Sequence, residues 1–173
     1  RVCDFKLLRG KLVVVPRVNA LGLAKNVRLL PEIGDMNRAY PPTGETPAEK
    51  MGAEIVSLMD RYQISLFIDL HEARTFHRLD KSSLGQTLLF ADNSVSASMA
   101  MDAVDAVNRG IDEPVKKFAL VGYPIPGSSA WYAGKYLGIA AFTVETSSKQ
   151  TLEERAEQHL AMVRTLLSAG GWL

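Results

Sequence analysis

The middle of the chain reads SLFIDLHE at residues 65–72, and the prediction of the fold starts from these residues. A short apolar run bounded by polar residues predicts a buried strand, here one that delivers His71 at its end. The run IAAFTVET at residues 139–146 predicts a second strand, which delivers Glu145. Ligands of open α/β sheets bind beyond the carboxyl ends of the strands. We therefore expect His71 and Glu145 to lie at the ligand-binding edge of a sheet.

Helix signals separate these runs from other strand-like runs. Thr46-Pro47-Ala48-Glu49 and Thr151-x-x-Glu154 are capping boxes, and each predicts the start of a helix. Strands that alternate with helices predict an α/β layer structure with a largely buried sheet. No internal repeat or linker occurs, so we expect one domain over residues 1–173. The other predicted elements are strands at Leu12–Val15, Thr87–Phe90 and Val115–Val121 and helices at Ser94–Arg109, Ser129–Leu137 and Thr151–Ala169.

The segment from Asn19 to Pro42 has no helical periodicity and predicts a long irregular loop. Long loops in compact domains are usually functional or disordered. Two arginines and an asparagine in one loop suit the binding of a carboxylate, because a guanidinium group makes bidentate contacts with it. The alternative is a surface loop with ordinary charges. The candidate residues of this loop are Arg28, Asp35, Asn37 and Arg38.

Composition limits the classes of protein to which the chain can belong. It has 173 residues, 47% hydrophobic and 23% charged, with a net charge of +1, as expected for a soluble globular protein. Nucleic-acid binding normally needs a stripe of basic residues, and the sequence has none. No apolar run approaches the ~18 residues of a transmembrane helix. The single cysteine, Cys3, excludes a cysteine-based zinc site, and we expect it to be a small apolar residue. A cytoplasmic or periplasmic location and the oligomeric state stay open.

The candidate residues supply complementary chemical roles. Hydrolysis of an amide needs an electrophile such as a metal, a base for water and donors for the developing oxyanion. His71, Glu145 and Arg28 match these three roles. Each also has an ordinary interpretation: His71 as a hydrogen-bonded structural residue, Glu145 as a solvated strand end and Arg28 as a surface charge.

Five blocks of sequence resemble the zinc carboxypeptidases in order and spacing. They are VVPRVN at residues 14–19, Arg28, DMNR at residues 35–38, DLH at residues 69–71 and TVET at residues 143–146. The pattern is more similar to the succinylglutamate desuccinylase/aspartoacylase branch of that superfamily. The resemblance implies an α/β fold with a mixed, largely parallel central sheet flanked by helices.

The resemblance also implies a function and a role for each candidate residue. It implies a hydrolase that cleaves an amide bond in a peptide or small molecule with a free carboxylate, using one zinc ion. His71 corresponds to a zinc ligand, Glu145 to the general base, and Arg28 to the residue that polarises the scissile carbonyl. The residues that correspond to the carboxylate-binding loop are Asn37 and Arg38, with Asp35 as their support.

One family motif is absent from the sequence. The H-x-x-E motif, which provides two zinc ligands in the family, occurs nowhere in the chain. A catalytic zinc needs three protein ligands, so we expect the two others upstream of residue 1 and this fragment alone to be inactive. The alternative is a metal-free, hydrolase-like module that binds a carboxylate ligand without catalysis. A third possibility is a structural or partner-binding domain.

Overall fold

A four-stranded sheet forms the centre of the molecule, in a computed structural model that describes residues 4–173. The strand order is β1-β4-β2-β3. β1 pairs with β4 and β2 with β3 in parallel, whereas β2 and β4 are antiparallel. The sheet is therefore mixed and largely parallel, which confirms the expected fold class. Cys3 lies outside the described residues. The strands are β1 (Leu66–Ala73), β2 (Thr87–Phe90), β3 (Ala119–Leu120) and β4 (Ala140–Ser147).

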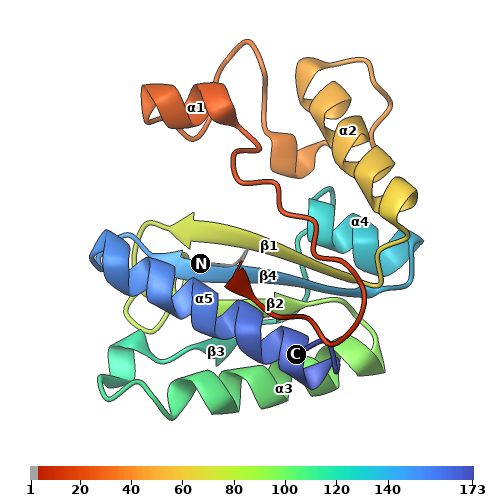
Figure 1. Cartoon of the computed structure of the whole chain (residues 1–173). Coiled ribbons are helices and arrows are strands. Elements are labelled where there is room, and N and C mark those ends of the chain that lie inside the picture. Colours follow the sequence, from red (N-terminus) through yellow and green to blue (C-terminus); the bar gives the residue numbers. More distant parts are fainter. Residues whose placement is uncertain (1–3) are drawn as a thin grey trace.

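Helices cover both faces of the sheet (Figure 1). α3 and α5 pack against each other and against one face, whereas α4 packs on β1 and β4 from the other side. α2 lies on the same side as α4 and packs against η2, and α1 lies farther away, beyond η2. The helices are α1 (Ala20–Lys25), η2 (Met36–Arg38), α2 (Pro47–Tyr62), α3 (Ser94–Asn108), η3 (Pro114–Lys116), α4 (Ser129–Tyr136) and α5 (Leu152–Ala169).

The larger core lies between the sheet and the α3–α5 layer. Successive side chains of a strand point to opposite faces, so alternate residues of β4 enter this core. Phe142 and Val144 are fully buried there, packed with Met162 and Leu166 of α5. Burial of such a side chain contributes about 1.5–3 kcal/mol, which fixes the register of β4 against its neighbours.

Small residues form the contact between the sheet and α4. Ala130 and Ala133 of α4 and Ala141 of β4 are buried together. A Cβ atom added at Gly134 would lie 2.3 Å from the Cβ of Ala91, so the helix approaches the sheet as closely as it can. This close contact fixes the amino terminus of α4 beside β1 and β4.

Both predicted capping boxes are present. Thr46 accepts a hydrogen bond from the Glu49 amide and Glu49 accepts one from the Thr46 amide, at the start of α2. Thr151 and Glu154 make the same reciprocal pair at the start of α5. Reciprocal bonds satisfy main-chain donors that the first turn of a helix leaves free.

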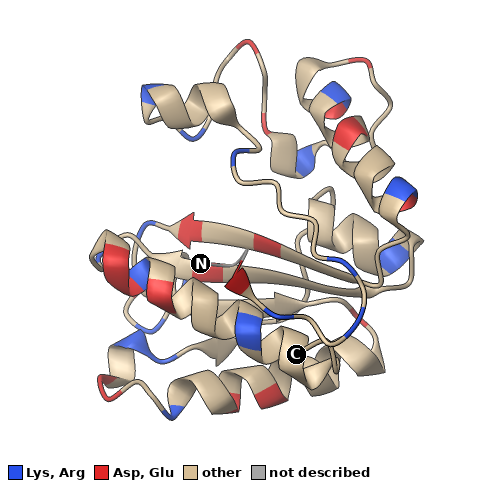
Figure 2. Cartoon of the chain, in the orientation of Figure 1, with Lys and Arg blue, Asp and Glu red and all other residues tan. Residues whose placement is uncertain are grey.

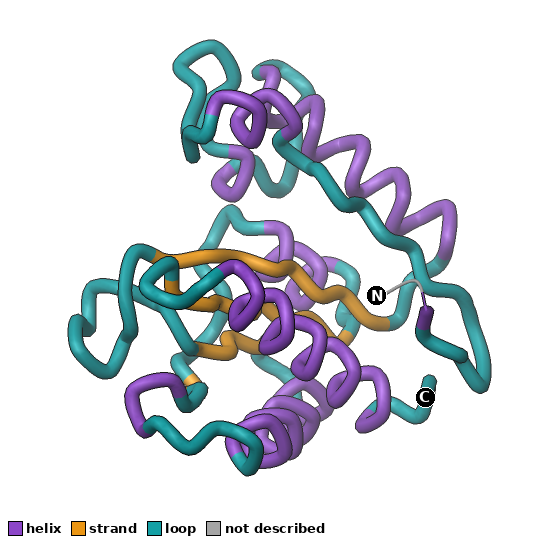
Figure 3. Tube along the Cα trace, turned by 60° about the vertical axis from the view of Figure 1, so that its left-hand side comes forward, coloured by secondary structure: helices purple, strands orange, loops and turns teal. Residues whose placement is uncertain are grey.

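The prediction of a buried strand at Leu12–Val15 is wrong. The segment is a loop without strand pairing (Figure 3). Its four residues are 36–43% exposed. A β-branched run favours an extended chain, but a strand also needs a partner, and among residues 4–173 none pairs with it. The segment instead borders a cavity beside β1.

Two further predictions need correction. The region from Asn19 to Pro42 is not wholly irregular, because it contains α1 and η2. Asn19 caps α1 through a hydrogen bond from the Gly22 amide, a short-range signal that helical periodicity does not detect. The strand expected at Val115–Val121 is reduced to the two residues of β3, because Pro114 starts a 3-10 turn just before it.

Charged residues of both signs are distributed over the elements (Figure 2). No helix within residues 4–173 combines the length and apolar character needed to cross a membrane.

We predict that Gly134→Ala destabilises the protein, although alanine normally favours a helix over glycine by about 1 kcal/mol. The added methyl group would overlap Ala91, and overpacking of this kind typically costs about 1–3 kcal/mol. Thermal unfolding should show a lower melting temperature for this variant and recovery in the double variant Ala91→Gly/Gly134→Ala. Gly110→Ala is the control, because its new Cβ would meet only ordinary contacts. A Gly134→Ala variant as stable as the parent would contradict the close contact.

Candidate active site

His71 and Glu145 face each other across two parallel strands. They are directly paired in the register of β1 and β4, so both side chains project from the same face of the sheet. The His71 Nδ1 lies 3.7 Å from the Glu145 Oε1. Glu145 is buried, and the His71 side chain is 22% exposed. The sequence predicts both residues at the ends of strands; in the structure each lies two residues before the end of its strand, and the pairing of the strands brings the two side chains together.

Asp69 is a third member of this group. It precedes His71 by two residues in the same strand, so it projects from the same face. Its Oδ2 lies 3.1 Å from the His71 Nε2. The imidazole therefore lies between two carboxylates, Asp69 on its Nε2 side and Glu145 on its Nδ1 side.

The surroundings shift the pKa values of all three groups. Burial lowers the pKa of His71, but the hydrogen bond and charge of Asp69 and the charge of Glu145 outweigh it, so the pKa is raised. Burial raises the pKa of Glu145, and the nearby charges of His71 and Arg28 oppose it only in part. Burial alone would raise the pKa of Asp69, but hydrogen bonds from His71 and Ser129 outweigh it, so the pKa is lowered. The site therefore holds one carboxylate that resists protonation and another that accepts a proton more readily.

The amino terminus of α4 contacts this group through Ser129. Its hydroxyl donates a 2.5 Å hydrogen bond to Asp69 Oδ2. The Ser129 amide donates a 3.1 Å hydrogen bond to the Oδ1 of Asn37, which comes from η2. The Asn37 side-chain oxygen Oδ1 accepts this bond. The side-chain nitrogen Nδ2 has no hydrogen-bond partner among the described residues, so it can donate to a ligand.

Asp35 organises the loop that carries Arg28 and Asn37. Its Oδ1 accepts a 3.0 Å hydrogen bond from the Asn37 amide and so caps η2. Its Oδ2 lies 3.9 Å from the Arg28 Nη2. The Arg28 side chain is 69% exposed, so its guanidinium can still bind a ligand.

The Arg38 side chain bonds to the main chain of its own loop. Its Nη1 donates a 2.5 Å hydrogen bond to the main-chain carbonyl of Asn37, and the residue is exposed. Gly127 packs on its main chain, where an added Cβ would lie 3.3 Å from the Arg38 Cα. Arg38 would have to change rotamer to reach a ligand held by Asn37.

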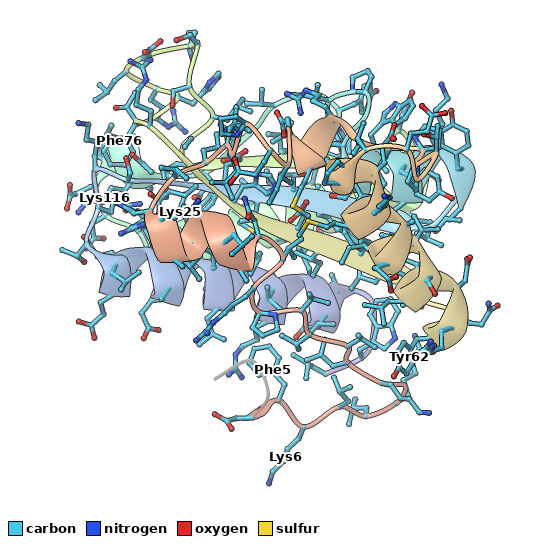
Figure 4. All side chains as sticks on the ribbon, turned by 90° about the horizontal axis from the view of Figure 1, so that it is seen from above. Phe5, Lys6, Lys25, Tyr62, Phe76 and Lys116 are labelled. Atoms are coloured by element: carbon cyan, nitrogen blue, oxygen red, sulfur yellow. The ribbon has the colours of Figure 1, made fainter. Side chains whose placement is uncertain are left out.

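A cavity of about 1030 Å³ connects the polar residues with an apolar groove along β1. In the view from above, Phe76, just after β1, and Lys25 of α1 lie toward one end of the molecule, and Tyr62, at the end of α2, toward the other (Figure 4). The polar lining includes Arg28, Asp35, Asn37, Asp69, His71 and Ser129.

Three residues of the site were missed by the sequence analysis. Asp69 could have been found, because a residue two positions before His71 in a strand shares its face. Ser129 gave no local signal, since its partners lie 60 and 92 residues away. Tyr40 also borders the cavity, and burial together with the charge of Asp69 raises the pKa of its hydroxyl.

The described residues can supply one ligand of a metal site, His71. Asp69 takes the Nε2 side of His71 and leaves the Nδ1 side free to bind a metal ion. Among residues 4–173 no cluster of three or more His, Cys, Asp or Glu side chains is arranged to hold a metal ion. A catalytic zinc needs three protein ligands, so a complete zinc site would need ligands from outside these residues.

Comparison with solved structures identifies the class of fold. Csd4 from Helicobacter pylori, a D,L-carboxypeptidase, in its mDAP-bound form superposes with a TM-score of 0.83 and 22% sequence identity over 94% of this chain. Its tripeptide-bound form gives a TM-score of 0.78 and 21% identity over 87% of this chain and 41% of that chain. A metallo-carboxypeptidase from Burkholderia cenocepacia gives 0.60 and 14% over 83% of this chain and 40% of that chain.

These similarities show that the chain has the same fold as the matching parts of these proteins. The chain spans less than half of Csd4, because the alignment covers 44% of that chain. No protein-family model matches the sequence, and no curated protein matches it.

His159 supports the site from the opposite face of the sheet. Its Nε2 lies 3.1 Å from the hydroxyl of Thr146, the neighbour of Glu145 in β4, and its Nδ1 is buried without a hydrogen-bond partner among the described residues. Burial lowers the pKa of His159 to about 4, opposed by the main chain of His71 and reinforced by the charges of His71 and Arg155. The folded protein therefore favours the neutral imidazole.

We predict that His159 makes the protein less stable in acid. Its pKa is about 4 when folded, against 6.5 as the ordinary value. The unfolded chain therefore binds more protons between these values, and the free energy of unfolding should fall as pH drops through this window, by up to about 3 kcal/mol. Denaturant melts should show a shallower pH dependence for His159→Gln. Equal slopes in the parental protein and in this variant would contradict the assignment.

Proposed function

We propose that the protein is a zinc-dependent hydrolase that cleaves an amide bond next to a free carboxylate, as a carboxypeptidase or an N-acyl amino acid deacylase does. The observation that carries the proposal is the pair of partly buried His71 and buried Glu145, 3.7 Å apart on one sheet face and beside the loop of Arg28 and Asn37. Residues 1–173 would belong to the catalytic domain.

Glu145 is the proposed general base. Burial raises the pKa of its carboxyl group, and a base works best when its pKa approaches the working pH. Its carboxylate would take a proton from the attacking water and deliver it to the leaving amine. His71 would hold zinc through Nδ1, and the bound zinc would supply Lewis-acid activation.

The loop residues are proposed to bind the substrate. The free amide nitrogen of Asn37 can donate to a substrate carboxylate, and Arg38 can join it after a change of rotamer. Arg28 would polarise the scissile carbonyl, with Asp35 orienting its guanidinium. Structures of Csd4 with mDAP and with a tripeptide bound support a peptide substrate with a free carboxylate.

A second candidate function is a metal-free module that binds a carboxylate ligand. The observation that favours it is that His71 is the single well-placed ligand in the described part of the chain, where no three-residue metal cluster occurs. The carboxylate-binding loop would be retained in such a module, and turnover would be absent.

We predict that Glu145→Gln in the intact protein lowers kcat by about 10²–10⁴-fold, because glutamine keeps the shape of the side chain but cannot take a proton from water. A turnover assay on a peptide with a free carboxylate measures this loss. Glu72→Gln is the matched control, since Glu72 lies in β1 on the opposite face and pairs with Arg155. A folded, zinc-loaded Glu145→Gln variant with parental turnover would remove Glu145 from the mechanism.

Asn37→Asp should mainly weaken substrate binding. The new side chain keeps the oxygen that accepts from the Ser129 amide but replaces the donor with a negatively charged oxygen. A charge-assisted hydrogen bond contributes about 1.5–3 kcal/mol, so KM should rise by roughly 10- to 100-fold with a smaller change in kcat. Steady-state kinetics on the same substrate measure both constants, and an unchanged KM would place the substrate carboxylate elsewhere.

A further inference from the structure

Ser129 contacts both halves of the site. Its hydroxyl and its main-chain amide lie next to Asp69 in β1 and Asn37 in η2, which come from distant parts of the sequence. The hydroxyl has one proton and two nearby acceptors, Asp69 Oδ2 at 2.5 Å and Asn37 Oδ1 at 3.4 Å. The shorter contact takes the proton, and the Ser129 amide supplies the donor for Asn37.

Two hydrogen-bond donors therefore hold Asp69 through the same carboxylate oxygen, Oδ2. The Ser129 hydroxyl approaches its Oδ2 from α4, and the His71 Nε2 approaches it from β1 at 3.1 Å. A carboxylate fixed from two elements cannot rotate without losing one of these bonds. The position of the Asp69 acceptor relative to the His71 ring therefore depends on Ser129.

His71 has a competing acceptor on its other side. The Glu145 Oε1 lies 3.7 Å from Nδ1, so a small rotation of the ring would let Nδ1 carry the proton and donate it to Glu145. That tautomer could not bind a metal through Nδ1. Which nitrogen of a histidine is free for a ligand is set by the hydrogen bond that the other nitrogen makes.

We infer that Ser129 is a positioning residue: it holds Asp69 so that His71 keeps its proton on Nε2 and presents Nδ1 to a metal, while its amide orients Asn37. The inference deepens the proposed function and rests on it, because it assumes that Nδ1 is the atom of His71 that binds the metal. It adds that one residue at the start of α4 sets the geometry of both the metal ligand and the carboxylate-binding side chain.

The test is ¹⁵N NMR of the histidine rings in this chain, at a pH high enough to leave His71 neutral. The protonated and bare ring nitrogens have well-separated shifts, so the spectrum reports the tautomer directly. The parental chain should show His71 with the proton on Nε2. In Ser129→Ala the share of the Nδ1–H tautomer should rise by roughly 5- to 10-fold relative to Nε2–H, the change expected for the loss of one hydrogen bond.

Two further variants separate positioning from a general structural effect. Ser129→Thr keeps the hydroxyl and should restore the parental tautomer. Ser128→Ala removes the neighbouring hydroxyl that caps α4, where it accepts a hydrogen bond from the Trp131 amide. It should lower the melting temperature, through loss of the helix cap, without changing the tautomer. If Ser129→Ala does not fold, Ser129→Cys, similar in size but a weak donor, replaces it.

An unchanged tautomer in a folded Ser129→Ala or Ser129→Cys variant would overturn the inference. A parental His71 that carries its proton on Nδ1, or an equal shift in Ser128→Ala, would also overturn it. The proposed function fails separately, since a turnover assay on the intact, zinc-loaded protein does not depend on the tautomer measurement. If the intact protein turns over substrate but Ser129→Ala leaves the tautomer unchanged, only the role of Ser129 is wrong. If Ser129→Ala shifts the tautomer but the intact protein does not turn over substrate, only the proposed hydrolase is wrong.

Discussion

The parallel pairing of β1 with β4 is the constraint on which the candidate site depends. It sets His71 directly opposite Glu145 and turns both toward the α4 face. The opposite face of β4 is fully buried against α5, through Phe142 and Val144. A slip of one residue would bury Glu145 in that core and expose its apolar neighbours. The packing of the core therefore holds the proposed base in its position beside the histidine.

Close packing of α4 extends this constraint to the substrate-binding loop. Alanines and Gly134 let the helix approach the sheet, and its first residue, Ser129, then reaches both Asp69 and Asn37. The loop packs Leu30, Ile33 and Ala39 against Ala48 of α2, whereas its two arginines are exposed. The hydrogen bonds between Asn37 and Ser129 connect this loop to α4 and, through α4, to the sheet. Fold stability and site geometry are linked through one helix terminus.

The sequence was sufficient to predict the fold class, because capping boxes and apolar runs are local signals. α2, α5, β1 and β4 appear close to the predicted positions. It failed at Leu12–Val15, where β-propensity cannot tell whether a partner strand is present. Of the site, the residues at strand ends could be predicted, and the structure brings them together. The Ser129 contacts could not, since they depend on how α4 docks against β1. The rotamer of Arg38 is also a tertiary property that no motif encodes.

The most direct measurement is turnover by the intact, zinc-loaded protein of two peptides that differ only at the C-terminus, one with a free carboxylate and the other amidated. Asn37 and Arg38 are proposed to recognise the negative charge beside the scissile bond, and loss of a charge-assisted contact is worth about 1.5–3 kcal/mol per bond. The account predicts cleavage of the free peptide and at least roughly 10-fold lower kcat/KM for the amidated one. Equal cleavage of both peptides, or of neither, would contradict it.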